Sequence, residues 1–460
     1  MSGYWNDLVE PLLARRWILC TDVLAPLGPM LERLRDLGAP RPFVIAGSAG
    51  TGDLPAGDLA EVALLGTSGA TIMQGLRAYH DALRHLPGEV IDRIEAWDPH
   101  SEARVLSSWL DTDITIAGRP SWGGTPGTWK ALEDKTTVDA LWDAAGVRRA
   151  PSEVVPARAG ALLAAAAALD EGSGTVWAGD NTEGWHGGAE YLRWVRDPGA
   201  ATDDVAFFEQ RCTSVRVMPF LPGIPCSIHG MVFPDTVVAF RPVEMLVLRT
   251  GGSSLRYAGT ATTWDPPPGD RDHMRSTARR VGRHLRDLVD FRGAFTVDGV
   301  VTGRGFLPTE LNPRPGGGLG AVARGADMAP LVTIHRALVA GEDLGYRPAE
   351  LERTVVAGAD RNRTARALLP VARPIVESRE ATITVADGDV RFAGDGDADA
   401  DADGTITLGP SAQGGLVIVS VESGVIPAGA SFAPTATRAL SLADATWDLG
   451  IGSLTPAEPA

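Results

Sequence analysis

Three residues with oxygen-bearing side chains could share one divalent cation: Asp298, Glu310 and Asn312. Carboxylate and amide oxygens are hard ligands that suit Mg²⁺, and three of them leave coordination places open for the oxygens of a phosphate group. Two carboxylates held side by side repel each other, and a divalent cation between them would remove that repulsion. The residue types therefore predict a site for Mg²⁺ and phosphate.

Alternating apolar and polar residues predict a β-hairpin that would bring these ligands together. The strands would cover residues 295–302 and 306–312, with Gly303–Gly305 as a three-residue loop. In the register that such a loop sets, Asp298 lies directly opposite Glu310, with Cβ atoms about 5 Å apart.

A turn is the second reading of the same segment. Asp298-Gly299 has the composition of a two-residue hairpin turn, which would leave Glu310 as an ordinary carboxylate at a strand end. The residues that follow favour the metal site, because the guanidinium of Arg314 could clamp an oxyanion through two N–H groups. Three further residues would leave backbone N–H groups open to the same anion: Gly316, Gly317 and Gly318.

The composition limits the classes of partner and the cellular location. With 42 basic and 58 acidic residues the net charge is -16, which argues against nucleic acid or an anionic membrane as the main partner. The three cysteines lack the spacing of a zinc or redox site and are interpreted as reduced thiols. The N-terminus is acidic where a signal peptide would be basic, and no apolar run reaches the ~18 residues of a membrane helix. We therefore expect a cytoplasmic protein.

A chain of 460 residues is expected to form two or three domains. Residues 1–125 alternate predicted strands and helices, which indicates an α/β domain. Within it, Gly47–Gly52 could be a nucleotide-binding loop or a plain turn from strand to helix, since it fits neither common phosphate-loop spacing. Glycines and prolines at 123–127 mark a boundary, and strands without assignable chemistry predict a small domain after about residue 346.

Lysine occurs only twice in the chain, at Lys130 and Lys135. A genome rich in G and C would explain the scarcity, but not why the two survivors are five residues apart. A lone lysine such as Lys135 is ordinarily a solvated helix residue, and that alternative has to be weighed against a role at a phosphate.

These segments together resemble the ATP-grasp ligases over roughly residues 126–345. The resemblance is carried at one end by Asp298 and by Glu310-x-Asn312-Pro313-Arg314 with its glycines, and at the other by Asp134-Lys135. The flanking domains and three strings are most similar to peptide ligases of the pheganomycin type. The strings are Trp177-Ala178-Gly179-Asp180, Pro225-Cys226-Ser227-Ile228-His229-Gly230 and Pro308-Thr309-Glu310-Leu311-Asn312-Pro313-Arg314.

The resemblance implies an α/β (α+β) fold in three parts. An ATP-grasp domain at 126–345, with a lid subdomain at about 150–215, would follow a Rossmann-like pre-ATP-grasp domain at 1–125. A small β-rich C-terminal domain at 346–460 would complete the chain.

The resemblance also assigns residues to ATP, because the family uses a phosphate lysine, a glycine-rich lid and a hinge strand that receives adenine. The residues expected to bind ATP are Lys130, Lys135, Gly184, Gly187, Gly188, Met218, Phe220, His229 and Glu244. Arg314, Gly316 and Gly317 would act in catalysis by stabilising an acyl phosphate and a tetrahedral oxyanion. Arg241, with Arg249 near it, could hold phosphate beside the metal or be a solvated arginine.

Two features of the family are missing. Ala178 stands where the second phosphate lysine is expected, so that either an arginine replaces it or the grip on phosphate differs. Met218 and Pro219 stand where the family carries two glutamates, which leaves the ribose contact unassigned. His186 in the lid loop could reach a phosphate or simply be an exposed loop residue.

What the resemblance implies is an ATP-dependent carboxylate–amine ligase that forms an amide through an acyl phosphate and releases ADP and phosphate. It would need ATP and Mg²⁺, with small carboxylic acids and amines or peptides as substrates; a homodimer is possible. The alternatives are a carboxylate-activating enzyme with a non-amine acceptor and a non-catalytic nucleotide-binding protein. A dinucleotide oxidoreductase built on Gly47–Gly52 is a more distant one.

Overall fold

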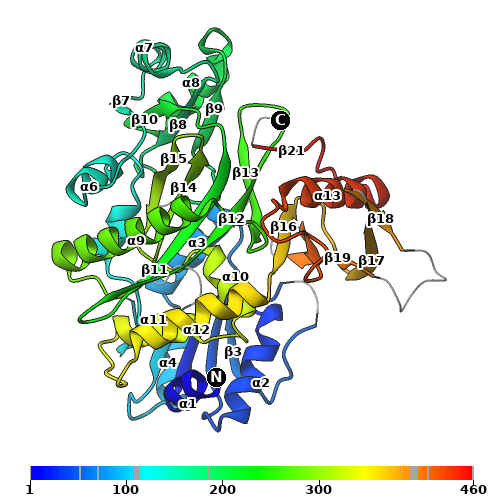
Figure 1. The fold of residues 1–460 in the computed structure, drawn as a ribbon. Helices are drawn as coiled ribbons and strands as arrows, with labels where there is room; N and C mark the ends of the chain where they lie inside the picture. Colours follow the sequence, from blue (N-terminus) through cyan, green and yellow to red (C-terminus); the bar gives the residue numbers. More distant parts are fainter. Residues whose placement is uncertain are drawn as a thin grey trace.

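Three sheets organise the chain in the computed structural model (Figure 1). The structure describes residues 2–50, 53–69, 72–107, 114–184, 186–386, 388–393, 402–411 and 414–457. Within these ranges a parallel sheet lies near the N-terminus, an antiparallel lid sheet lies at the opposite end, and a long antiparallel sheet joins the two. No helix in the described ranges is long and apolar enough to cross a membrane.

The N-terminal sheet is parallel throughout and has the order β3-β2-β1-β4. Its first two strands are almost wholly buried, as expected of parallel strands covered on both faces. The strands are β1 Trp17–Val23, β2 Phe43–Ser48, β3 Glu61–Leu64 and β4 Arg104–Ser107. The helices around it are α1 Ser2–Leu13, α2 Gly28–Asp36, α3 Ile72–Arg84 and α4 Gly88–Trp97. The predicted α/β class of this segment is confirmed.

The long sheet has eleven strands and crosses the boundary predicted near residue 346. Its order is β15-β14-β11-β12-β13-β16-β20-β19-β17-β18, and β21 pairs with β12. The first half comprises β11 Ile224–Val232, β12 Val237–Arg249, β13 Leu255–Ala261, β14 Gly293–Thr302 and β15 Gly305–Asn312. The second half comprises β16 Ala365–Val371, β17 Arg379–Ala386, β18 Asp389–Phe392, β19 Gly404–Ser411, β20 Gly414–Val421 and β21 Thr455–Pro456. Ladder hydrogen bonds between β13 and β16 therefore join the last third of the chain directly to the middle third.

The lid sheet is antiparallel, with the order β7-β10-β8-β9. Its elements are β7 Glu153–Pro156, α7 Ala159–Leu169, β8 Thr175–Gly179, β9 Leu192–Val195, α8 Thr202–Arg211 and β10 Ser214–Pro219. Both helices pack on one face of this sheet around a separate apolar cluster that includes Trp177 and Phe208. Before the lid come β5 Thr115–Ile116, β6 Arg119–Pro120, α5 Gly127–Lys130 and α6 Val138–Ala144.

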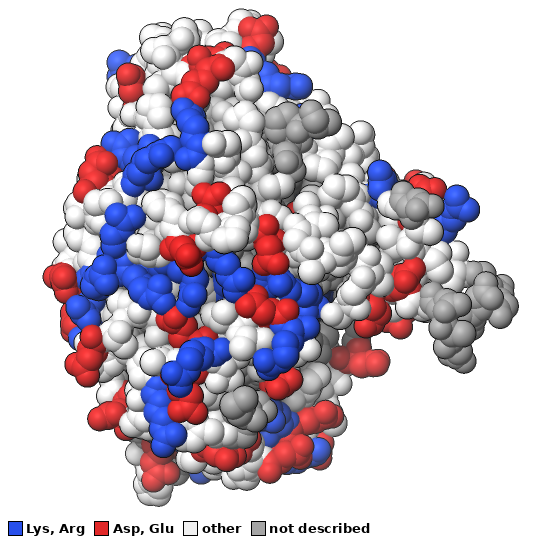
Figure 2. All heavy atoms as spheres, viewed as in Figure 1, with Lys and Arg blue, Asp and Glu red and all other residues white. Residues whose placement is uncertain are grey.

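Helices cover the faces of the long sheet (Figure 1). They are α9 Pro268–Val289, α10 Gly317–Gly325, α11 Leu331–Val339, α12 Pro348–Arg361 and α13 Ala433–Trp447. Met274, Ala278, Val281 and Leu285 of α9 are buried, whereas Leu288 is exposed. Arg271, Arg275 and Arg279 of α9 pair with Asp360 and Glu352 of α12, and Figure 2 shows basic and acidic side chains interspersed on this face of the molecule.

The hairpin β14–β15 places Asp298 opposite Glu310, which confirms the predicted pairing. The predicted loop is wrong, because Thr302 pairs with Gly305 and the loop has two residues. A β-bulge next to Asp298 inserts one extra residue in β15 and restores the predicted register beyond it. The alternative turn at Asp298-Gly299 is also wrong, since both residues lie within β14.

Gly299 is the residue whose lack of a side chain allows this hairpin to close. A Cβ there would lie 2.4 Å from the carbonyl oxygen of Leu307 and 2.7 Å from the ring of Phe306. Gly299→Ala should therefore lower the free energy of unfolding by about 1–3 kcal/mol, as measured by urea denaturation. In the control Gly303→Ala the new methyl meets nothing within 4 Å. Equal stability of the two variants would contradict this account of the bulge.

Candidate active site

The predicted ligands lie together with a lysine from a distant segment. Asn312 Nδ2 donates a hydrogen bond to Asp298 Oδ2 over 2.9 Å, and Ser227 Oγ donates to Asp298 Oδ1 over 2.5 Å. Lys135 Nζ lies 3.2 Å from Glu310 Oε1, and its side chain is only 7% exposed. The solvated-residue alternative for Lys135 is therefore wrong.

The electrostatics of this pair favour a bound cation. Burial, followed by the neighbouring charge of Glu310, raises the pKa of Asp298 from about 3.8 to about 7. The hydrogen bond from Ser227 and the charges of Arg314 and Lys135 act in the opposite direction. Among the described residues no group of three His, Cys, Asp or Glu side chains could hold a metal ion alone. Two carboxylates, an amide and open coordination places fit Mg²⁺ bound together with phosphate.

Arg314 is held in a defined orientation beside these ligands. Its Nε donates to Glu133 Oε1 over 3.0 Å, and one terminal nitrogen donates to Asn312 Oδ1 over the same distance. Glu133 is buried, so the ion pair between it and Arg314 is partly shielded from water. The structure thus groups Arg314 with the predicted metal ligands, as the sequence suggests.

The three glycines after Arg314 form the start of α10, which lies directly on strand side chains. A Cβ at Gly316 would lie 2.6 Å from Thr296 Oγ1, and a Cβ at Gly317 would lie 2.4 Å from Tyr257 OH. A Cβ at Gly318 would lie 2.4 Å from His229 Nε2, so all three positions require glycine. Gly316 N–H donates to Thr296 Oγ1 over 3.0 Å, so the expectation that it faces an oxyanion is not met.

His229 lies beneath the first turn of α10 and is fully buried. Its Nδ1 lies 2.9 Å from Thr296 Oγ1, while Nε2 has no hydrogen-bond partner among the described residues. Burial lowers the pKa of the ring to about 3, so His229 is neutral. Its position under the glycines of α10 makes it a support of that turn.

The lid loop brings His186 close enough to Lys135 for their charges to interact. His186 is 4% exposed and stacks on Tyr191 with ring centroids 4.1 Å apart, so the exposed-loop alternative is wrong. Burial, followed by the charge of Lys135, lowers the pKa of His186 to about 4. Gly184 and Gly188 adopt φ values of 97° and 63°, which favour glycine, and they flank His186 with Gly187.

The remaining lysine faces another part of the molecule. Lys130 ends α5, and its charge contributes, after burial and Arg84, to lowering the pKa of His80 to about 4. His80 belongs to α3 of the N-terminal sheet region. The contacts found for Lys130 therefore point toward the N-terminal part of the chain, whereas those of Lys135 point toward Glu310.

The predicted hinge residues are buried at the junction between the lid and the long sheet. Met218 packs with Leu221 and with Leu307 of β15, and Phe220 stacks on Trp194 with ring centroids 4.0 Å apart. The backbone N–H of Phe220 already donates to the carbonyl of Gly174 over 2.9 Å. An adenine at this strand would have to use other backbone groups or the apolar side chains.

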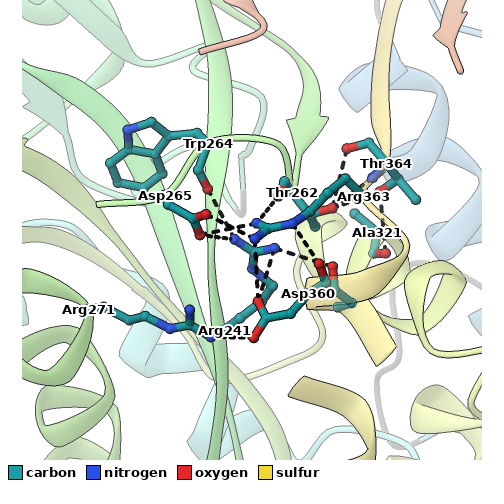
Figure 3. A network of polar contacts seen from close by, with 10 residues as sticks. Arg241, Thr262, Trp264, Asp265, Arg271, Ala321, Asp360, Arg363 and Thr364 are labelled. Carbon is teal, nitrogen blue, oxygen red and sulfur yellow. Dashed lines mark hydrogen bonds and ion pairs between the residues drawn. The ribbon is translucent and has the colours of Figure 1, made fainter. Parts of the chain in front are cut away.

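The structure places Arg241 in a buried ion-pair network (Figure 3). Its side chain is 0% exposed, with one terminal nitrogen 2.5 Å from Asp265 and the other 3.4 Å from Asp360. Arg363 pairs with the same two carboxylates, and Arg271 pairs with Asp360. None of the contacts found for Arg241 leads to the candidate metal ligands, so the structure does not join it to them.

Glu244 is likewise occupied by the fold. Its carboxylate accepts hydrogen bonds from Ser431 Oγ and from the backbone N–H groups of Phe432 and Ala433 at the start of α13. Such a carboxylate stabilises the N-terminus of a helix. Glu244 therefore attaches α13 to the long sheet and does not join the ATP residues.

Arg216 of β10 is a further candidate that no local sequence pattern indicates, and it lies directly opposite Ala178 in the lid sheet. Its side chain is 2% exposed and makes an ion pair of 2.7 Å with Asp139. One terminal nitrogen also approaches the carbonyl of Thr309 in β15 at 3.4 Å. The absence of the expected lysine at Ala178 indicates that another cation could replace it. Only the pairing of β8 with β10 identifies Arg216 as the arginine beside that position.

The shifted pKa of Asp298 makes a prediction about pH. A folded-state value above the unfolded one means that ionised Asp298 destabilises the metal-free protein, increasingly as pH rises from about 4 to about 7. Asp298→Asn removes this penalty. In urea denaturation without divalent cations, its stability relative to wild type should be greater at pH 8 than at pH 4, by up to about 4 kcal/mol. A pH-independent difference would contradict the assigned shift.

The network around Arg241 makes a second prediction. Arg241→Met leaves Asp265 and Asp360 short of one buried partner and should lower the free energy of unfolding by about 3 kcal/mol. Arg379→Met, at an exposed position of β17, is the control and should change stability by less than about 0.5 kcal/mol. Lost turnover with unchanged stability in Arg241→Met would instead indicate a catalytic role.

Comparison with known proteins gives similarity in structure only. No family model and no curated protein matches the sequence. An ADP complex of N5-carboxyaminoimidazole ribonucleotide synthetase matches with a TM-score of 0.51 at 12% identity, covering 94% of this chain and 97% of that one. The L-amino acid ligase from Bacillus licheniformis matches with a TM-score of 0.51 at 12% identity, covering 89% and 94%.

A third similar structure is the biotin carboxylase domain of the Hydrogenobacter thermophilus 2-oxoglutarate carboxylase, in complex with MgADP, ADP and bicarbonate. Its TM-score is 0.54 at 12% identity, covering 88% of this chain and 86% of that one. At such identities the similarity establishes the fold and not the activity. The chain therefore has an ATP-grasp fold.

Proposed function

We propose that the protein is an ATP-dependent carboxylate–amine ligase. ATP phosphorylates a carboxylate, an amine attacks the resulting acyl phosphate, and an amide, ADP and phosphate are released. The observation that carries the proposal is the convergence of Asp298, Glu310, Asn312, Lys135 and Arg314 within an ATP-grasp fold. Such a cluster combines the ligands of a cation with two fixed positive charges for phosphate.

The residues present fit Mg²⁺, which Asp298, Glu310 and Asn312 would hold. When bound, the ion neutralises charge on the phosphate oxygens during phosphoryl transfer. Lys135, which is paired with Glu310, presents an ammonium group to the same region. Arg314 is aimed by Glu133 and Asn312, so little reorientation is needed to bind an oxyanion.

Arg216 is our candidate for the missing second phosphate lysine. It supplies a cation from the strand position opposite Ala178, and its pairing with Asp139 fixes the guanidinium against the lid sheet. An arginine keeps its charge even when buried, which suits a fixed contact with phosphate. Lys135, Gly184, Gly187 and Gly188 remain the proposed ATP residues of the entry segment and lid.

The finer assignment follows from the resemblance. We propose amino acids or short peptides as substrates, as in peptide ligases of the pheganomycin type, and a role in natural product biosynthesis. A cytoplasmic location and small-molecule rather than nucleic-acid partners belong to the same proposal. An L-amino acid ligase among the similar structures supports this choice of substrate class.

The test is ADP release with Mg-ATP across a panel of amino acids and short peptides, offered singly and in pairs, with products weighed by mass spectrometry. ADP release that needs a pair, with a product mass equal to the sum less water, establishes amide ligation. A product in which the acid is joined to a thiol or a hydroxyl would show that the acceptor is not an amine. ATP binding without any turnover would favour a nucleotide-binding protein.

Glu310→Gln tests the residues within that assay. The variant keeps the size of the side chain but removes one of two opposed carboxylates, and turnover should fall by at least about 100-fold because charge neutralisation on phosphate is impaired. Thermal unfolding should show that the variant stays folded. Glu32→Gln, at an exposed position of α2, is the control and should keep wild-type turnover. Wild-type turnover in Glu310→Gln would overturn the assignment of the site.

A further inference from the structure

The face of α10 that follows the glycine turn carries a second positive feature. Gly317, Gly320 and Arg324 follow one another at helical spacing and lie on one face of the helix. A side chain on a helix points back toward its N-terminus, and Arg324 does so here. One of its terminal nitrogens would lie 3.7 Å from a Cβ at Gly320.

Two further side chains belong to the same place. Tyr257 of β13 brings its hydroxyl against Gly317, and its ionisation is influenced by Asp298 on one side and Arg324 on the other. Burial, then Asp298, raises the pKa of Tyr257 to about 12, so the phenol keeps its proton as a hydrogen-bond donor. Arg366 of β16 is close enough to Arg324 for its charge to lower the pKa of that residue.

Neither arginine has an acidic partner among the described residues. The pKa of Arg324 is lowered by burial and by Arg366, and only Tyr257 opposes this shift. Nε of Arg366 is buried without a hydrogen-bond partner in the described part of the chain. By contrast, Arg241 a short distance away is balanced by two aspartates. Two half-buried guanidinium groups that repel each other indicate a site for an anion that comes from outside the chain.

The fold holds these residues in place from both sides. Arg366 is paired with Thr260 across the β13–β16 ladder. Thr364, two residues before it, donates from Oγ1 to the carbonyl of Ala321 on α10 over 3.5 Å, as Figure 3 shows. Alternate residues of β16 face the apolar core of the C-terminal region, and Arg366 lies on the opposite face. The anion site is therefore built jointly by α10, β13 and β16.

We propose that Arg324, Arg366 and Tyr257 bind a carboxylate of the substrates that is not the one activated by ATP. This inference rests on the proposed ligase function, and it names the substrate class of the same site. Arg324 lies about 10 Å along the helix from Gly317, and its side chain reaches back to Gly320, so one small substrate can span the distance between Arg324 and the start of the helix. The carboxylate belongs either to the amine, as in an amino acid acceptor, or to an acid that carries two carboxylates.

The experiment compares wild type with Arg366→Gln and Arg324→Gln, using the substrate pair that the ADP-release panel identifies. Each carboxylate that is not activated is replaced in turn by its primary amide, first on the amine and then on the acid. For wild type, the amide at the recognised position should raise KM at least about tenfold, because two charge-assisted hydrogen bonds are lost. For the variants, KM for the substrate with its free carboxylate should rise by a similar factor. Replacing that carboxylate by the amide should then change KM little.

Arg283→Gln, at an exposed position of α9, is the matched control and should behave as wild type. Thermal unfolding of each variant separates a lost contact from a lost fold, and Tyr257→Phe gives a second variant that removes only a hydroxyl. Sensitivity to the amide on the amine identifies an amino acid acceptor, and sensitivity on the acid identifies a dicarboxylate donor. Wild-type turnover that is indifferent to both amides, or variants that keep the full amide penalty, would overturn the inference. Absence of ADP release from wild type with every pair would count against the ligase function itself.

Discussion

Repulsion between two carboxylates is the constraint on which the centre of the structure depends. Asp298 and Glu310 face each other across a ladder, and the fold surrounds them with donors and cations: Ser227, Asn312, Lys135 and Arg314. These residues come from segments far apart in the chain. The segment before α6 that holds Lys135, strand β11 and both strands of the hairpin must therefore all be in place at once. Lys135 and Arg314 offset part of this negative charge, and a bound divalent cation would offset the repulsion that remains.

Much of this centre could be predicted because it is local in sequence. The alternation of residues in 295–302 and 306–312 predicts the hairpin, and the opposition of Asp298 to Glu310 follows from it. The predicted loop was one residue too long, but the predicted pairing of Asp298 with Glu310 was right because a bulge in β15 adds one residue. No residue pattern in β15 predicts that bulge. Short-range periodicity determines a strand, but bulges depend on the packing of neighbours such as Gly299 against Phe306.

The parts that could not be predicted involve contacts across long separations. Arg241 and Glu244 are charged residues on β12, within the segment that resembles the ATP-grasp ligases. In the structure, Arg241 belongs to a buried ion-pair network and Glu244 binds the start of α13. Their partners Asp265 and Ser431 lie 24 and 187 residues further along the chain, beyond the reach of any local pattern. Arg216 was missed for the same reason, because its relation to Ala178 exists only in the assembled sheet.

The continuity of the eleven-stranded sheet has a mechanical consequence. Hydrogen bonds between β13 and β16 connect the half of the sheet that holds Asp298 to the half that holds Arg366, so the two halves form one continuous, stiff sheet. The lid is a separate sheet with its own apolar cluster, so these hydrogen bonds do not extend into it. Substitutions in β16 can therefore alter the proposed anion site while the hairpin that holds Asp298 and Glu310 keeps its register, so that the proposed phosphate and substrate sites could vary independently along one sheet.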